Sequence, residues 1–282
     1  MSLMPLLAAC SLGGSGPTTP EAKAVPFAAT AKPHQHLTRK PAPLSKLNVN
    51  DALGGINGQA GIALLVNGRP VAAGSLQIGD AWSTSKVPVT IAALKRSMNS
   101  SNLAWAFNAI TASDNASAQS LWETLGSGTA AASATDVVLR ELADTTTRTN
   151  PFVTRSGYTA FGQTQWSLRN QALVASDLAC MRGLAETKVF SLMGKIESSE
   201  TWGLGMWSGA HFKGGWGPGN DGRYLVRQLG ALPLKDGWVA VAIAVIPSSG
   251  RFSDGSVDLT RITTWLWQHR ADLEPTVCGR GM

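Results

Sequence analysis

The chain has 282 residues and a net charge of +6, with 44% hydrophobic and 15% charged residues. This length and composition suit one globular core with a tail, or two closely packed subdomains. The basic residues are scattered, without the lysine–arginine stripe of a nucleic-acid-binding surface, and no apolar run approaches the length of a membrane span.

The N-terminus contains Leu7-Ala8-Ala9-Cys10 followed by Ser11, which resembles a bacterial lipobox, whose cysteine is lipidated. We therefore predict residues 1–10 to be the remnant of a lipoprotein signal and Cys10 to be the lipidation site. Only nine residues precede Cys10, and none is basic, whereas a signal peptide starts with a charged region. A chance match in a leader is the alternative. The lipobox implies a protein anchored by lipid to the bacterial cell membrane, outside the cytoplasm.

Residues 11 to about 42 are rich in Gly, Pro, Ala, Thr and Ser and have no apolar periodicity, which is typical of a flexible tether. The folded domain is predicted over 43–275. It begins with a short helix in 45–54, and two strands follow at 61–66 and 70–74, joined by an Asn-Gly hairpin turn.

The middle of the chain is predominantly helical, and we predict a helical subdomain over about 87–198. Its central helix is the largely apolar run 87–98. Three strands and a closing amphipathic helix follow, at 211–217, 224–232, 237–246 and 258–270. The third of these strands is apolar on both faces and is therefore expected to be buried.

This order of elements predicts an α+β fold. Strands from both chain ends form one antiparallel sheet with helices against it, and an all-helical subdomain is inserted between them.

The stretch Ser83-Thr84-Ser85-Lys86 stands at the start of the central apolar run. If Ser83 opens a helix, Lys86 lies one turn further on the same face. A neutral lysine amine there can take the proton of the Ser83 hydroxyl, which is a weak nucleophile without such a base. A surface serine and lysine at a helix start are the simpler interpretation. However, this is the only Ser-x-x-Lys in the chain, and two further fragments follow it.

Those fragments are Ser113-Asp114-Asn115 and Lys213-Gly214-Gly215. Together with the first stretch they resemble the S-x-x-K, S-D-N and K-T-G motifs of penicillin-binding proteins and class A β-lactamases. The resemblance covers roughly residues 45–270. The motifs fall at a helix start, in a loop between helices and on a strand, as that fold requires.

The resemblance implies a role for each matching position. Ser83 is the acylated nucleophile, Lys86 its base, and Ser113 the relay of a proton to the leaving nitrogen. Lys213 supplies positive charge for a substrate carboxylate and holds Ser113.

The resemblance also implies substrate contacts from Asn115, Gly214, Gly215 and Trp216. The backbone N–H groups of Ser83 and Trp216 would form the oxyanion hole. No metal and no cofactor are implied.

Three departures from the family pattern are visible. Gly214 replaces a threonine or serine whose hydroxyl normally helps to hold the substrate carboxylate. No Asp or Glu lies between Asp144 and Asp177, where class A enzymes carry the deacylating glutamate, so slow hydrolysis of the acyl-enzyme is expected. Thirty positions separate Ser83 from Ser113, which is short for class A and indicates a reduced helical subdomain.

Other residues carry weaker signals. In an oxidising compartment, Cys180 and Cys278 could pair in a disulfide, or they could remain two buried thiols. His211 shares a strand face with Lys213, either lining the cleft or serving a structural role. Trp82 and Trp216 could each form a wall of the site or pack in the core. Glu197 and Glu200 are expected to be solvated.

We therefore predict an extracytoplasmic serine acyl-enzyme hydrolase of the penicillin-recognising superfamily. It would act on an amide or ester, such as a peptidoglycan peptide or a β-lactam, with slow deacylation. The alternative is a catalytically degenerate lipoprotein that uses the same cleft to bind a cell-wall or protein ligand. Efficient β-lactamase activity ranks below both, and no nucleic-acid partner is expected.

Overall fold

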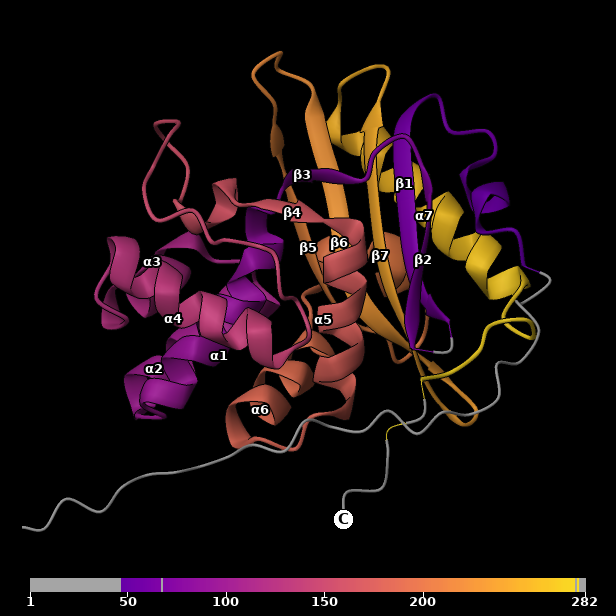
Figure 1. The fold of residues 1–282 in the computed structure, drawn as a ribbon. Helices are drawn as coiled ribbons and strands as arrows, with labels where there is room; N and C mark the ends of the chain where they lie inside the picture. Colours follow the sequence, from indigo (N-terminus) through magenta and orange to yellow (C-terminus); the bar gives the residue numbers. More distant parts are fainter. Residues whose placement is uncertain (1–46, 67, 277, 279–282) are drawn as a thin grey trace, which may run out of the picture. The chain divides into compact units, whose positions relative to one another are not determined.

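The computed structural model describes residues 47–66, 68–276 and 278, so the predicted lipidation site Cys10 and the tether 11–42 lie outside the described residues. Five antiparallel strands form the main sheet in the order β2-β1-β7-β6-β5 (Figure 1). They are β1 (Gly58–Val66), β2 (Arg69–Gly74), β5 (His211–Pro218), β6 (Tyr224–Leu234) and β7 (Gly237–Pro247). The predicted α+β fold, with a sheet drawn from both chain ends, is confirmed.

The remaining elements lie mostly between the two groups of strands. A second sheet pairs β3 (Ile78–Asp80) with β4 (Gln165–Ser167). The α-helices are α1 (Lys86–Arg96), α2 (Ser100–Thr111), α3 (Asn115–Thr124), α4 (Gly128–Glu141), α5 (Leu168–Cys180), α6 (Leu184–Met193) and α7 (Phe252–Gln268). The short 3-10 helices are η1 (Val49–Leu53), η2 (Trp82–Ser85), η3 (Phe161–Gln163), η4 (Ser198–Glu200) and η5 (Gly203–Met206). No helix of the described residues is long and apolar enough to cross a membrane.

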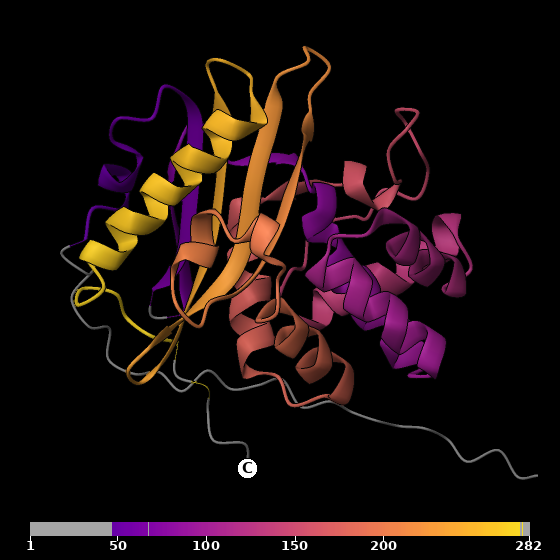
Figure 2. The same cartoon turned by 180° about the vertical axis from the view of Figure 1, so that it is seen from behind.

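The sequence of β7 explains how the sheet is covered on both faces. Its alternate residues Val239, Val241, Ile243 and Val245 belong to the core under α7. The intervening alanines belong to the core shared with α5 and the helical region. Helix α7 therefore covers one face and α5 the other, as Figures 1 and 2 show from opposite sides. Small side chains on the second face let α5 lie close to the backbone of the sheet.

The helical region is built around α1, which contacts α2, α3, α4 and α6. Every residue from Lys86 to Leu94 is buried, as expected for a central helix. The structure differs from the predicted helical subdomain 87–198 because that range also contains β4 and α5, and α5 packs on β1 and β7 of the sheet. Apolar periodicity shows that a helix is half-buried but not which surface covers it.

Arg227 ties the small sheet to the large one. It lies fully buried on β6 and donates to the carbonyls of Gly79 (2.8 Å), Asp80 (2.9 Å) and Trp166 (2.9 Å). It also donates to Gln171 Oε1 of α5 at 2.7 Å. Burial lowers the pKa of Arg227 to about 9, and the charge of Asp80 opposes this shift. Both terminal nitrogens of this guanidinium are engaged on the α5 side of the sheet, whereas its buried Nε has no hydrogen-bond partner among the described residues.

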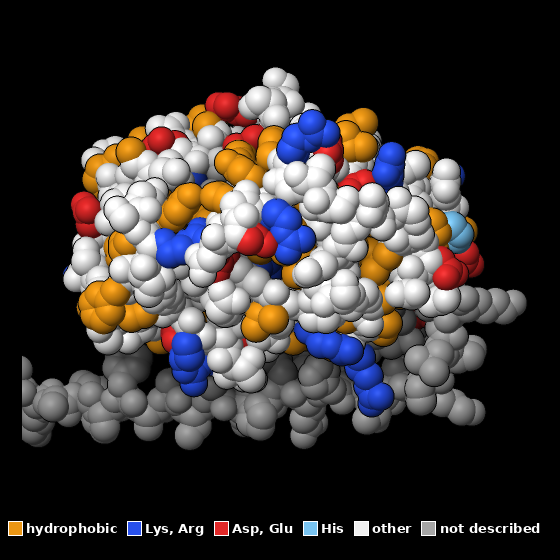
Figure 3. Space-filling view, turned by 90° about the horizontal axis from the view of Figure 1, so that it is seen from above, with side chains coloured by type: hydrophobic (Ala, Val, Ile, Leu, Met, Phe, Trp, Pro, Cys, Tyr) orange, Lys and Arg blue, Asp and Glu red, His pale blue; other side chains and the backbone are white. Residues whose placement is uncertain are grey.

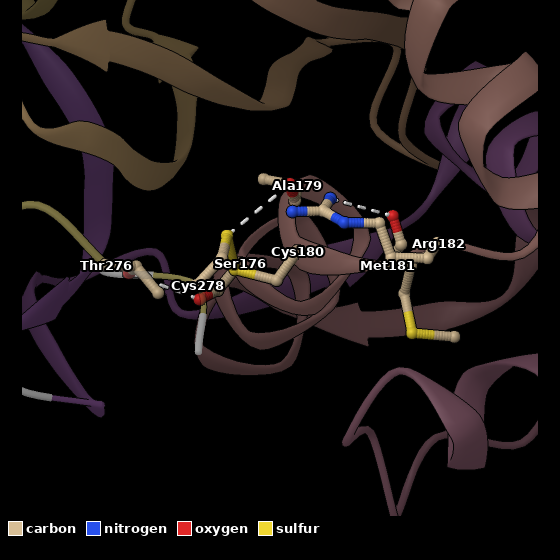
Figure 4. Close-up of a disulfide and its surroundings, with 7 residues drawn as sticks. All are labelled: Ser176, Ala179, Cys180, Met181, Arg182, Thr276 and Cys278. Carbon is tan, nitrogen blue, oxygen red and sulfur yellow. Dashed lines mark hydrogen bonds between the residues drawn. A yellow bond between two sulfur atoms is a disulfide. The ribbon is translucent and has the colours of Figure 1, made fainter. Parts of the chain in front are cut away.

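A disulfide joins Cys180, the last residue of α5, to Cys278 (Figure 4). The same segment is held by Ser176 Oγ, which donates to Thr276 Oγ1 at 3.3 Å, and by the bridge of Thr276 to Trp238. The C-terminal segment is thereby fastened to a mid-chain helix, 98 positions earlier in the sequence.

We predict that the double substitution Cys180→Ala with Cys278→Ala lowers the free energy of unfolding by about 2–4 kcal/mol. Without the cross-link, the unfolded chain gains conformational entropy. Urea denaturation of the purified domain measures this loss. Ser176→Ala is the control, since it removes only a neighbouring hydrogen bond and should cost roughly 0.5–1.5 kcal/mol. An unchanged urea midpoint in the double variant would contradict the prediction.

Candidate active site

Ser83 lies in η2, which runs directly into α1 at Lys86. The preceding residue, Trp82, has a φ of +49°, a conformation that is uncommon for a large side chain. The turn is held by two side chains: Ser85 Oγ donates to the carbonyl of Trp82 at 2.6 Å, and Thr84 Oγ1 donates to that of Ala81. Such a strained backbone is typical of functional sites. It leaves Ser83 half-buried between fully buried neighbours.

The loop between α2 and α3 brings two polar side chains to Lys86. Asp114 caps α3 by accepting the N–H of Ser117 at 2.7 Å, and Ser113 has a φ of +54°. Lys86 Nζ lies 2.8 Å from Asn115 Oδ1 and 3.4 Å from Ser113 Oγ, and it also donates to the Ser113 carbonyl. The Ser83 hydroxyl has no hydrogen bond to any described residue.

Lys213 reaches the Ser113 hydroxyl from the sheet. It lies on the edge strand β5, is 0% exposed, and donates to Ser113 Oγ at 2.8 Å and to the Gly214 carbonyl at 3.1 Å. The three motifs, which are far apart in the sequence, therefore meet at Ser113 Oγ. The catalytic assignment of these residues stays a prediction, but the structure brings them together.

The structure corrects the expectation that Glu200 is solvated. Glu200 is buried at the end of η4, and its Oε2 lies 3.3 Å from Lys213 Nζ. Glu197 is exposed, as expected. Sequence reasoning missed Glu200 because it lies in a stretch without periodicity or motif. One signal was present: a buried lysine needs an opposite charge, and few acidic residues precede β5.

Burial and neighbouring charges shift the pKa values of Lys86 and Lys213. The pKa of Lys86 is lowered to about 7, first by burial and then by the charge of Lys213, with Glu200 and Asp114 opposing the shift. Burial also lowers the pKa of Lys213, and Glu200 opposes this. Near neutral pH, a large fraction of Lys86 is therefore a neutral amine, which is the form that a general base requires.

Close packing fixes β5 against η2. A Cβ on Gly215 would lie 2.8 Å from the nitrogen of Thr84 and 2.9 Å from that of Ser83, so only glycine allows this approach. Gly214 faces the opposite way, where a Cβ would lie 3.3 Å from the ring of Trp202. The space that a threonine or serine would use is thus bordered by an indole.

The two tryptophans beside the motifs both make packing contacts. The Trp216 ring contacts Trp202 (5.8 Å between centroids) and Phe252 (5.1 Å) on the α7 side. Trp82 is buried and meets the ring of Tyr158 edge-on at 5.1 Å. The structure therefore supports the packing interpretation of Trp82.

The segment after Asp144, in which no Asp or Glu occurs before Asp177, is fastened at both ends. Asp144 is fully buried and accepts hydrogen bonds from Trp166 Nε1 and Asn170 Nδ2, both at 2.8 Å. At the far end of the segment η3 contacts η2. The Gln163 Oε1 atom accepts hydrogen bonds from Arg155 N (2.7 Å) and Thr154 Oγ1 (2.6 Å), so this side-chain carbonyl binds groups of its own loop.

Arg155 is a further residue that sequence reasoning missed. Its guanidinium lies over the rings of Tyr158 (4.8 Å) and Trp82 (5.2 Å) and donates to the Pro218 carbonyl at 2.8 Å. It thereby fastens the loop to the end of β5 next to η2. Isolated arginines in loops carry no sequence pattern that marks such a contact.

His211 takes the structural role. Its Nδ1 lies 2.7 Å from the Phe190 carbonyl, and its ring packs between Phe190 (4.3 Å) and Trp238 (5.0 Å). Burial lowers its pKa. Across the described residues, no group of three or more His, Cys, Asp or Glu is placed to hold a metal ion.

Comparison with solved structures identifies the fold. A class A β-lactamase from Mycobacterium abscessus matches with a TM-score of 0.62 at 15% identity, covering 79% of this chain and 99% of that chain. A β-lactamase from Chitinophaga pinensis gives a TM-score of 0.65 at 14% identity, covering 79% of this chain and 97% of that chain. This chain has the β-lactamase fold. No protein-family model and no curated protein matches the sequence.

A β-lactamase from Sphaerobacter thermophilus is also similar, with a TM-score of 0.61 at 15% identity, covering 80% of this chain and 97% of that chain. Identities this low establish the fold alone. The assignment of chemistry to the β-lactamase-like site therefore depends on the residues described above.

We predict that the Lys86 ammonium titrates near pH 7, because burial and the Lys213 charge both disfavour its protonated form. NMR of protein carrying 13Cε-labelled lysine measures this titration directly, without any substrate. Lys86→Arg identifies the resonance by removing it. Titration of every lysine above pH 10 would contradict the prediction.

The two glycines of the β5 motif offer a matched pair. Gly215→Ala should lower the free energy of unfolding by about 1–3 kcal/mol, because its methyl group meets backbone atoms of η2. Gly214→Ala should cost less, since its neighbour is the side chain of Trp202. Urea denaturation compares the two, and equal losses would show that β5 does not depend on this close approach.

Proposed function

We propose that this protein is a serine acyl-enzyme hydrolase acting on an amide or ester carbonyl, with Ser83 as the nucleophile. One observation carries the proposal: a buried lysine amine, whose pKa burial lowers to about 7, stands one turn after Ser83 and shares the Ser113 hydroxyl with a second buried lysine, Lys213. The β-lactamase fold of the chain supports this chemistry.

In the proposed reaction, neutral Lys86 takes the proton of the Ser83 hydroxyl as its oxygen bonds to the carbonyl carbon. The negative charge on the carbonyl oxygen is held by the N–H groups of Ser83 and Trp216. Lys86 then returns the proton through Ser113 to the leaving nitrogen or oxygen, whose bond to carbon breaks. Among the described residues no hydrogen bond joins Ser83 to Lys86, and catalytic hydrogen bonds often tighten only when substrate binds.

Deacylation is proposed to be slow. Water must attack the acyl-enzyme with the help of a base, and residues 145–176 contain no Asp or Glu. The Gln163 amide is bonded within its loop, and Glu200 is paired with Lys213. The acyl-enzyme should therefore accumulate, as it does in penicillin-binding proteins. Peptidoglycan peptides and β-lactams are the substrates that the resemblance implies.

We further propose that Cys10 anchors the chain by lipid to the outer side of the cell membrane. A second candidate function uses the same site for binding only, as a lipoprotein that holds a cell-wall or protein ligand. The unbonded Ser83 hydroxyl and the glycine at position 214 favour it. The presence of Lys86, Ser113 and Asn115 together argues against the binding function, because binding alone does not require this set of residues.

The test is intact-mass spectrometry after incubation with a penicillin and, separately, with p-nitrophenyl acetate, whose hydrolysis is also followed by absorbance. Wild type should form, with at least one of the two reagents, an adduct that persists for hours, and Ser83→Ala should form none with either. Ser120→Ala, a serine of α3 away from the motifs, is the control and should behave as wild type. An adduct on Ser83→Ala would refute the nucleophile. No adduct and no turnover in wild type would favour the binding function.

A further inference from the structure

Lys213 has no hydrogen-bond donor left for a substrate. An ammonium group carries three N–H donors. Three described acceptors surround Lys213 Nζ: Ser113 Oγ at 2.8 Å, the Gly214 carbonyl at 3.1 Å and Glu200 Oε2 at 3.3 Å. The side chain is also 0% exposed. A substrate carboxylate could therefore bind Lys213 only by displacing one of these partners.

The charge of Lys213 is also balanced before any substrate arrives. Glu200 lies against its ammonium group from η4, with Oε2 3.3 Å from Lys213 Nζ. This pairing leaves Lys213 with less positive charge to attract a substrate carboxylate.

The neighbouring arginines do not compensate. Arg227 is engaged with carbonyls on the α5 side, and Arg155 bonds Pro218 O and Asn220 Oδ1. Position 214 offers no hydroxyl, and Trp202 borders the space beside it. Figure 3 shows the molecule from above the view of Figure 1, and on this face basic and acidic side chains are interspersed.

We propose that this site selects acyl substrates whose group beside the scissile bond is uncharged, such as neutral esters and peptide amides, and discriminates against a free carboxylate at that position. Glu200 is the residue that sets this preference, by occupying one donor of Lys213 and cancelling its charge. This inference rests on the proposed function of the same site and narrows its substrate class.

The test measures binding separately from catalysis. N-acetyl-D-alanyl-D-alanine and its C-terminal amide are titrated into Ser83→Ala, and Kd is followed by NMR shifts. We expect the amide to bind about tenfold more tightly, which corresponds to about 1.4 kcal/mol. Adding Glu200→Gln should move the ratio toward the acid by a similar factor, because it removes the negative charge.

Glu197→Gln is the matched control, since Glu197 is exposed and lies three residues before Glu200. It should leave the ratio unchanged, and Glu200→Asp, which keeps the charge, should keep the preference for the amide. Equal or tighter binding of the acid, binding of neither probe, or equal ratios in Glu200→Gln and Glu197→Gln would overturn the inference.

Hydrolysis of p-nitrophenyl acetate by wild type and by Ser83→Ala reports on the proposed function alone. If wild type does not hydrolyse p-nitrophenyl acetate faster than Ser83→Ala does, the proposed catalysis is refuted. The ratio of the Kd values for the acid and the amide would still decide the charge preference. The two failures are thereby distinguishable.

Discussion

The site depends on the burial of one lysine charge beside one hydroxyl. Lys213 is completely buried, and a buried cation is tolerated only with close partners. Ser113 and Glu200 are those partners, and they come from an interhelical loop and from a short helix before β5. Lys86 Nζ donates to the same Ser113 Oγ at 3.4 Å. Burial of Lys86 is the first cause of its low pKa, and the neighbouring Lys213 charge lowers that pKa further.

The position of β5 in the fold explains how Lys213 comes to lie beside Ser113. Strand β5 is an edge strand, so one of its faces and its free edge are available to the helical region. Gly215 lets that edge approach the turn that carries Ser83, and the alternation of β5 sends Gly214 and Trp216 to the α7 side. Arg155 lies over the Trp82 ring of the same turn and donates to the Pro218 carbonyl, while the buried Asp144 fastens the start of the loop to Trp166. Each of these contacts joins segments that are distant in the sequence.

The sequence predicted the α+β fold and the position of each motif within it, because strand alternation, the Asn-Gly turn and helix periodicity are local signals. It could not predict that α5 would cover the sheet rather than join the helical subdomain, since both surfaces are apolar. Glu200 was missed for a related reason: nothing near it in the sequence reveals that Lys213 lies beside it. The environment of Gly214 depends likewise on Trp202, twelve residues earlier. Local sequence patterns predict the helices and strands, whereas the charged neighbours of a buried residue depend on tertiary contacts.

We expect Ser83 to react while Lys213 remains bonded to Ser113 and Glu200. A crystal structure of wild type inactivated by a neutral alkylphosphonate ester tests both parts at once. It should show phosphorus bonded to Ser83 Oγ, its oxygen near the N–H groups of Ser83 and Trp216, and Lys213 Nζ still within hydrogen-bond distance of Glu200. Phosphorus on another residue, or Lys213 turned away from Glu200 toward the inhibitor, would contradict this expectation.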